Sequence, residues 1–171
     1  LTDLPFTFAF YSLVMKQLVQ SLSTGLTTLV EVPSPVVGSN QILVRTSTSL
    51  VSAGTERMLV DFGKSNLLDK ARQHPDKVRD AIQKVKTDGL LTTIDAINSK
   101  LDFPLPLGYC NVGTVIAIGS NVTDFSVGDR VVSNGPHAEL VSVATNLAAI
   151  IPDNVTDISA SFTILASIGL Q

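Results

Sequence analysis

Short segments that alternate apolar and polar residues, joined by very brief connections, make up much of this chain of 171 residues. Residues 16–22 and 26–32 are separated only by a Ser-Thr-Gly sequence at 23–25, which suits a hairpin turn. A third segment, 41–50, alternates in the same way. Because parallel strands need a crossover of about a dozen residues or more, these segments are expected to pair antiparallel. The pattern predicts a mainly β domain.

Strand-like segments return in the second half of the chain. They lie at residues 111–118, 129–133 and 138–143. The stretch 157–171 is apolar and is expected to be a helix, with Thr156 or Asp157 as its N-cap. A helix that is apolar nearly all round is normally buried on more than one side, so this one is expected to lie between two domains.

A charge-dense segment interrupts the strands. Residues 57–102 hold nine of the twelve basic residues and seven of the fifteen acidic ones. Apolar residues recur there every three to four positions, which predicts helices at about 66–73, 75–87 and 92–100. Mixed charges on a helix usually mark a solvated face, so the insertion is expected to be a solvated excursion, with a lid or an oligomer contact as the alternatives.

The composition excludes several classes of protein. A net charge of −3 gives no electrostatic footprint for nucleic acid, and no apolar run is long enough to cross a membrane. The single cysteine, Cys110, excludes an internal disulfide and an all-cysteine zinc site. Apolar residues make up 44% of the chain, which predicts a sizeable core. We therefore expect a soluble, cytoplasmic protein.

The first fourteen residues differ from the rest. Residues 1–14 hold four of the nine aromatic side chains but a single charged one, Asp3. They lack the basic region of a secretory signal. We interpret Met15 as the natural start and 1–14 as a disordered or loosely docked extension.

The most specific run of residues extends over 107–131. It contains Leu107-Gly108-Tyr109-Cys110-Asn111-Val112-Gly113, a strand, and then Gly119, Val122, Phe125, Gly128, Asp129 and Val131. Val122 and Phe125 are expected to fill the core, and a turn at Gly128 leads into the next strand. This order resembles the signature of the medium-chain dehydrogenases/reductases: G-H-E-x-x-G, a strand, then G-x-x-V-x-x-F-x-x-G-D-x-V. That superfamily includes zinc alcohol dehydrogenases and quinone reductases.

The resemblance implies a domain organisation. It predicts a GroES-like, partly open barrel over residues 15–156, with the helical insertion at 57–102. Residues 157–171 would begin the interdomain helix that leads to a dinucleotide-binding (Rossmann) domain. The runs Ser52-Ala53-Gly54-Thr55-Glu56-Arg57 and Ser133-Asn134-Gly135-Pro136-His137-Ala138-Glu139 are most similar to the bi-domain oxidoreductases. In that group an inositol or glucose-fructose dehydrogenase-like module follows, and the chemistry is associated with surface-polysaccharide sugars.

The resemblance also locates the expected metal ligands, and they are missing. Zinc members of the family place a cysteine where this chain has Ala53 and a histidine where it has Tyr109. Cys110, Glu56 and His137 match no standard zinc-ligand spacing. No zinc is therefore expected.

Two hydroxyl-bearing residues are the candidates for catalysis. Thr55 stands where the family often places a proton-relaying hydroxyl, or it simply caps a helix. Tyr109 could stabilise developing charge in place of zinc, or it forms part of an apolar wall. Cys110 is expected to be a small buried residue, His137 a surface or hydrogen-bonded loop histidine, and His74 a solvated one.

The chain lacks the G-x-G-x-x-G turn that cradles a pyrophosphate. The resemblance implies that NAD or NADP is bound by the following domain. The expected function is therefore a zinc-independent, NAD(P)-dependent oxidoreduction of an alcohol or carbonyl, with a sugar derivative in polysaccharide biosynthesis as candidate substrate. This segment alone would be inactive. The alternatives are a non-catalytic binding or scaffold module and a co-chaperonin-like assembly protein. Expected partners are a small-molecule substrate and the following domain, with neither nucleic acid nor membrane, and a homo-oligomer is compatible with the sequence.

Overall fold

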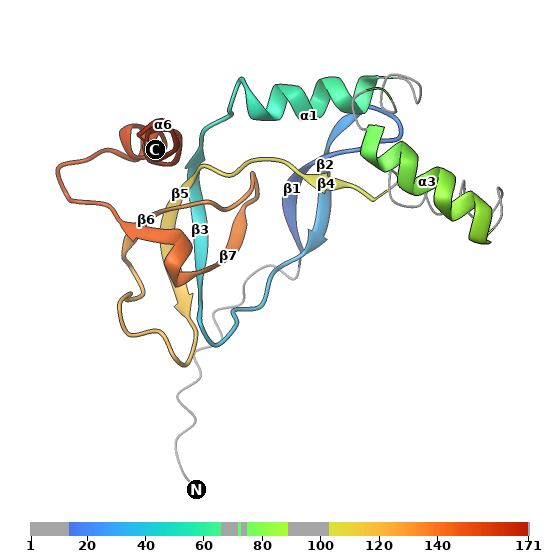
Figure 1. Cartoon of the computed structure of the whole chain (residues 1–171). Coiled ribbons are helices and arrows are strands. Elements are labelled where there is room, and N and C mark those ends of the chain that lie inside the picture. Colours follow the sequence, from blue (N-terminus) through green and yellow to red (C-terminus); the bar gives the residue numbers. More distant parts are fainter. Residues whose placement is uncertain (1–13, 66–71, 73–74, 89–102, 171) are drawn as a thin grey trace, which may run out of the picture. The chain divides into compact units, whose positions relative to one another are not determined.

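The computed structural model describes residues 14–65, 72, 75–88 and 103–170, and its chain divides into two compact units (Figure 1). Unit 1 consists of Leu1–Gln17, Val30–Leu50 and Tyr109–Gln171. Unit 2 consists of Leu18–Leu29 and Val51–Gly108. The predicted extension at 1–14 lies outside the described residues, except for Val14.

Unit 1 is built on a five-stranded antiparallel sheet with the order β7-β3-β5-β6-β8. Its strands are β3 (Gln41–Ser49), β5 (Asn111–Ile118), β6 (Arg130–Ser133), β7 (Leu140–Ala144) and β8 (Ala148–Ile150). Figure 1 shows β3 and β5 running side by side through the middle of this sheet. The antiparallel character predicted for the segment 41–50 is confirmed, but its partners are β5 and β7, whereas the segments 16–22 and 26–32 belong to another sheet.

The strands β3 and β5 approach each other closely at Gly113. A Cβ atom there would lie 2.1 Å from the backbone oxygen of Arg45, so only glycine fits without a shift of the backbone. Near this point the register slips: Thr46 pairs with Gly113, but Thr48 pairs with Val112. Ser47 is thus the extra residue of a β-bulge, which turns Thr46 and Ser49 toward the same face of the sheet.

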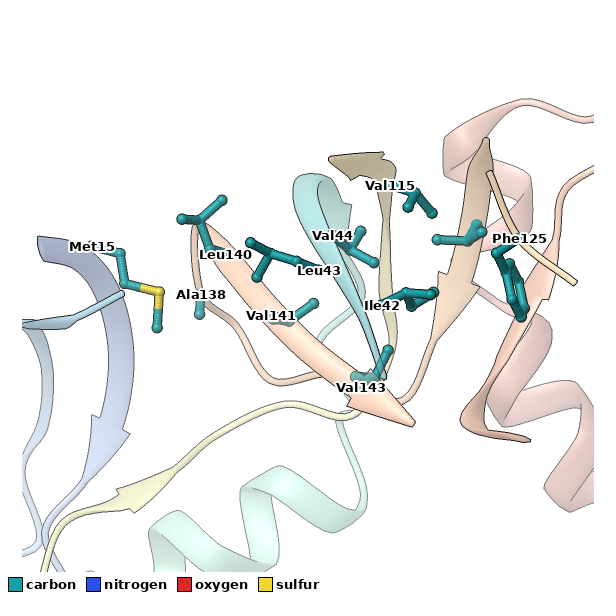
Figure 2. Close-up of a cluster of buried hydrophobic side chains, with 11 residues drawn as sticks. Met15, Ile42, Leu43, Val44, Val115, Phe125, Ala138, Leu140, Val141 and Val143 are labelled. Atoms are coloured by element: carbon teal, nitrogen blue, oxygen red, sulfur yellow. The ribbon is translucent and has the colours of Figure 1, made fainter. Parts of the chain in front are cut away.

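The main core of unit 1 is a cluster of buried apolar side chains. Figure 2 shows it along β3 and β7, with Met15 at one end and Phe125 at the other. Ile42, Val44 and Val115 in its middle have no exposed surface. A second cluster gathers Val112, Val132, Ile151 and Ala160. The expectation that Phe125 fills the core, with Val122 packed against it, is confirmed.

The predicted C-terminal helix is two short helices. They are α5 (Asp157–Ala160) and α6 (Thr163–Gly169). Thr156 is the N-cap of α5, as predicted, and its side chain accepts a hydrogen bond from the Ser159 N–H at 3.2 Å. At the break, the Ser161 hydroxyl donates to the backbone oxygen of Ile158 at 2.7 Å. None of the described helices has the length and hydropathy needed to span a bilayer.

Unit 2 contains a short antiparallel pairing and two helices. β1 (Val14–Gln20) lies between β2 (Thr27–Pro33) and β4 (Leu105–Pro106) in a three-stranded sheet, and the boundary of the unit passes through β1 and β2. Val19 pairs with Pro106 and Gln20 with Leu105. The two sheets of the chain do not close into a barrel in the part that the structure describes.

The helices of unit 2 are α1 (Thr55–Lys64) and α3 (Pro75–Asp88). α3 confirms the helix predicted at 75–87. Of the two other predicted helices, 92–100 lies outside the described residues, as does 66–73 apart from Arg72. The apolar spacing did not locate α1, but the alternative in which Thr55 caps a helix requires a helix here, and α1 begins at this residue.

Candidate functional site

Thr55 is the first residue of α1 and its side chain is exposed. It does not cap the helix: Gly54 occupies the N-cap position, and the Ser52 hydroxyl accepts from the Thr55 N–H at 3.4 Å. The buried Glu56 carboxylate in turn accepts from the Ser52 N–H at 2.8 Å. This reciprocal pair resembles a capping box and accounts for the burial of the Glu56 carboxylate. The structural alternative for Thr55, a side-chain cap, is therefore wrong.

A groove of about 390 Å³ lies beside α1 within unit 2. Leu18, Val51 and Leu107 supply apolar parts of its lining, and Arg57 and Lys64 supply charged parts. Ala53, at the position of the expected zinc-ligating cysteine, also contributes to the lining. Its methyl group offers no ligand atom, so the groove contains no metal donor at this position.

Tyr109 belongs to unit 1 and its side chain is half-buried. The preceding Gly108 has a φ of +95°, a backbone conformation that favours glycine. The next residue, Cys110, is buried and forms no disulfide, as predicted. The Leu50 N–H donates to the Cys110 backbone oxygen at 2.9 Å, which holds the segment before β5 against the end of β3. Thr55 and Tyr109 thus belong to different units.

A group of polar side chains lies in unit 1 where β3 and β6 end and β5 begins. The Ser49 hydroxyl and His137 Nδ1 are 2.8 Å apart, which confirms His137 as a hydrogen-bonded loop histidine. Asn111 Nδ2 donates to Thr46 Oγ1 at 2.8 Å, and Thr46 Oγ1 donates to the Ala138 backbone oxygen at 2.6 Å. Sequence reasoning missed Thr46, Ser49 and Asn111. The available signal in the sequence was a polar residue, Asn111, at the start of an apolar strand.

The described residues do not fit a zinc site. In the part of the chain that the structure describes, no three His, Cys, Asp or Glu side chains form a group that could hold a metal ion. His137 contacts Ser49, and the Glu56 carboxylate is bound to the backbone of Ser52. His74 lies outside the described residues.

The most pronounced electrostatic feature of unit 1 is an ion pair. Arg130 donates from Nε and Nη2 to Asp157 Oδ1, at 3.1 and 2.5 Å, and the Ser47 hydroxyl donates to Asp157 Oδ2 at 2.5 Å. Arg130 Nη2 also donates to the Val155 backbone oxygen at 2.8 Å. The hydrogen bonds from Ser47 and Arg130 lower the pKa of Asp157 below 3.8, because they stabilise the charged carboxylate. The pair attaches the start of α5 to the sheet.

We expect Asp157→Asn to lower stability at neutral pH and to lose this effect in acid. Since the pKa is lower in the folded protein, the carboxylate stabilises the fold above the unfolded pKa, and the contribution disappears as pH falls through the folded pKa. The free energy of unfolding is measured with urea from about pH 7 to about pH 2.5. It should differ between parent and variant only at the higher pH values. The exposed Asp153, changed to Asn, is the control. A difference in the free energy of unfolding between parent and Asp157→Asn that stays constant down to the lowest pH would contradict the prediction.

Comparison with known proteins agrees with the motifs of the sequence. Residues 81–153 match the family described as Alcohol dehydrogenase GroES-like domain. A comparison with curated proteins gives no significant match.

Solved oxidoreductases share the fold. A quinone oxidoreductase from Coxiella burnetii is similar with a TM-score of 0.58 and 19% identity over 92% of this chain and 45% of its own. Galactitol-1-phosphate dehydrogenase from Escherichia coli gives a TM-score of 0.62 and 16% identity over 91% and 43%. A mycobacterial protein complexed with NADPH gives 0.54 and 24% over 85% and 37%.

The chain spans less than half the length of these three structures. Their likeness covers both units and confirms the mainly β, GroES-like fold. Residues 81–153 are therefore similar to the alcohol dehydrogenase GroES-like domain, and the chain shares the fold of these oxidoreductases.

Proposed function

We propose that this domain forms the substrate side of a zinc-independent, NAD(P)-dependent oxidoreductase that interconverts an alcohol and a carbonyl. The observation that carries the proposal is the pair of residues at the expected zinc-ligand positions. Ala53 cannot bind a metal, and Tyr109 offers a phenol in place of an imidazole. Thr55 and Tyr109 supply hydroxyl groups at or beside these positions.

In this proposal the side chains of Tyr109 and Thr55 assist the proton transfer. A bound nicotinamide would supply or accept the hydride. Tyr109, half-buried, donates a hydrogen bond to the carbonyl oxygen and stabilises the negative charge that develops on it. Thr55 relays the proton that this oxygen takes up when the alcohol forms, because a hydroxyl can donate and accept at the same time.

The dinucleotide itself would be held by a following domain. The eleven glycines of this chain include no G-x-G-x-x-G turn, so its residues do not fit a complete pyrophosphate site. We place the following domain against α5 and α6, whose Phe162 and Ile168 side chains are 52% and 58% exposed. Burying such side chains stabilises an interface by roughly 1.5–3 kcal/mol each. A mycobacterial protein of the same fold is complexed with NADPH, which supports this choice of cofactor.

A sugar derivative is the substrate class that we favour. The likeness to a galactitol-1-phosphate dehydrogenase supports a polyol or sugar, and the Ser52-Ala53-Gly54-Thr55-Glu56-Arg57 run supports a bi-domain oxidoreductase of polysaccharide biosynthesis.

The purified protein is expected to contain no stoichiometric zinc. Elemental analysis by mass spectrometry after dialysis against a weak chelator should find far less than one zinc per chain. A medium-chain dehydrogenase that retains its catalytic zinc, treated in parallel, is the control. One tightly bound zinc per chain would overturn the zinc-independent mechanism.

Changes at the two hydroxyls test the catalytic assignment. In the protein that carries this domain together with its dinucleotide-binding domain, Tyr109→Phe and Thr55→Val should each lower kcat/KM by about 10²- to 10⁴-fold. NADH and NADPH oxidation is followed with aldehydes, quinones and sugar aldehydes as substrates. Thr123→Val, at an exposed turn threonine, is the matched control. Unchanged kcat/KM in both hydroxyl variants would contradict the assignment.

The loss of both zinc-ligand positions also favours a second candidate, a non-catalytic binding or scaffold module. The same assay separates the two. Cofactor-independent substrate binding without turnover would support the binding module, and turnover would support the enzyme.

A further inference from the structure

Three polar side chains form a row across the sheet of unit 1. Asn111, the first residue of β5, pairs with Ser49, the last of β3, and with Ser133, the last of β6. Residues paired across antiparallel strands project from the same face, with Cβ atoms about 4.5–5.5 Å apart. Asn111 and Ser133 have no exposed surface. Two members of the row are therefore fully buried polar side chains.

The amide nitrogen of the Asn111 side chain donates two hydrogen bonds, whereas the amide oxygen accepts none from the described residues. Nδ2 donates to Thr46 Oγ1 at 2.8 Å and to the Pro136 backbone oxygen at 3.4 Å. Oδ1 is buried and has no hydrogen-bond partner in the part of the chain that the structure describes. An unsatisfied buried acceptor destabilises the fold, because it loses its hydration without gaining a replacement hydrogen bond.

The surroundings fix which way the amide points. Thr46 Oγ1 already donates its proton to the Ala138 backbone oxygen at 2.6 Å, and the Pro136 oxygen can only accept. Rotating the amide by 180° would bring Oδ1 against these two acceptors and lose both bonds. Oδ1 therefore keeps its orientation away from Thr46 and needs a donor from elsewhere.

The neighbouring Ser133 can supply a hydrogen-bond donor. Its Oγ accepts from the Gly135 N–H at 3.4 Å, which leaves the hydroxyl proton to be donated. No other partner of this hydroxyl occurs among residues 14–65, 72, 75–88 and 103–170. An acceptor on Asn111 and a donor on Ser133 thus stand next to each other in one row.

We propose that Asn111 Oδ1 and Ser133 Oγ together bind one internal water molecule. The water donates a proton to Asn111 Oδ1 and accepts one from Ser133, so both groups are satisfied. Water is the ligand because Oδ1 has no exposed surface through which a larger molecule could reach it. The bound water links the ends of β5 and β6, beside the loop that leads through Pro136 and His137. This site is independent of the proposed catalytic role of Tyr109.

A crystal structure of the full chain, at a resolution that orders internal waters, tests the proposal directly. We expect a single spherical density peak about 2.7–3.2 Å from Asn111 Oδ1 and within the same distance of Ser133 Oγ. Three results would overturn it: a protein donor on Oδ1, a polyatomic molecule in the density, or no density peak at all.

Magnetic relaxation dispersion of water oxygen in solution gives a second test. Asn111→Leu should remove one long-lived water from the count obtained for the parent protein, and Asn134→Leu, at an exposed position in the following loop, should remove none. Should Asn111→Leu fail to fold, Ser133→Ala replaces it, because it deletes one of the two partners and leaves the amide in place. An unchanged count of long-lived waters in the folded variant would refute the site.

Discussion

Gly119→Ala is expected to destabilise the domain by about 3 kcal/mol or more, at the upper end of what overpacking usually costs. An added Cβ would lie 2.1 Å from the backbone oxygen of Gly38 and 2.4 Å from that of Ser39. Both are backbone atoms of a turn that is itself bonded to this segment, since the Asn121 N–H donates to the Ser39 oxygen at 2.9 Å. No side chain can rotate away to relieve the overlap. Urea unfolding at neutral pH measures the loss.

Gly54→Ala is the matched control for this change. No atom lies within 4 Å of a Cβ added at Gly54, so its free energy of unfolding should stay within about 0.5 kcal/mol of the parent value. If Gly119→Ala proved as mild as Gly54→Ala, the close approach of the 38–39 turn to β5 would be wrong.

Phe125→Ala should cost about 3–5 kcal/mol, the usual loss for removing a buried aromatic ring. The Phe125 side chain is 8% exposed and lies at one end of the main core cluster (Figure 2). The exposed Phe103, 75% accessible, provides the control, because its removal opens no cavity. Thermal unfolding followed by circular dichroism compares the two. Equal and small effects of the two changes would show that Phe125 does not support the core.

Sequence patterns predicted the elements that carry their own periodicity. The alternation in 41–50 and 111–118 located β3 and β5, since one face of each strand meets the core. The Pro75 start and the amphipathic spacing after it located α3. Thr156 was predictable as a cap because a hydroxyl before an acidic first turn is a strong local signal.

Elements that depend on distant partners were not predictable. β4 and β8 are two and three residues long, too short for any alternation, and exist because β1 and β6 offer them partners. Apolar spacing did not locate α1, because its start depends on the side chains of Ser52 and Glu56. The Ser52 hydroxyl accepts from the Thr55 N–H, and the Glu56 carboxylate accepts from the Ser52 N–H. The apolar run 157–171 likewise gave no signal for the split between α5 and α6.

Some residues of the candidate site could likewise be predicted from the sequence, and others could not. Thr55 and Tyr109 could be selected from the sequence because they stand beside or at positions of a known motif. The polar row of Ser49, Asn111 and Ser133 could not, because it requires the register of three strands. The bulge at Ser47, which sets that register, has no signature in the sequence.

The close approach of β3 and β5 at Gly113 has a consequence for the evolution of such domains. The glycine is required by backbone spacing, with 2.1 Å between a hypothetical Cβ and the Arg45 oxygen. Ala53 and Tyr109, by contrast, contribute nothing to the two core clusters of unit 1. Selection on folding and selection on chemistry therefore act on separate positions. Residues at 53 and 109 can therefore change while the glycine spacing of the sheet stays under the same constraint.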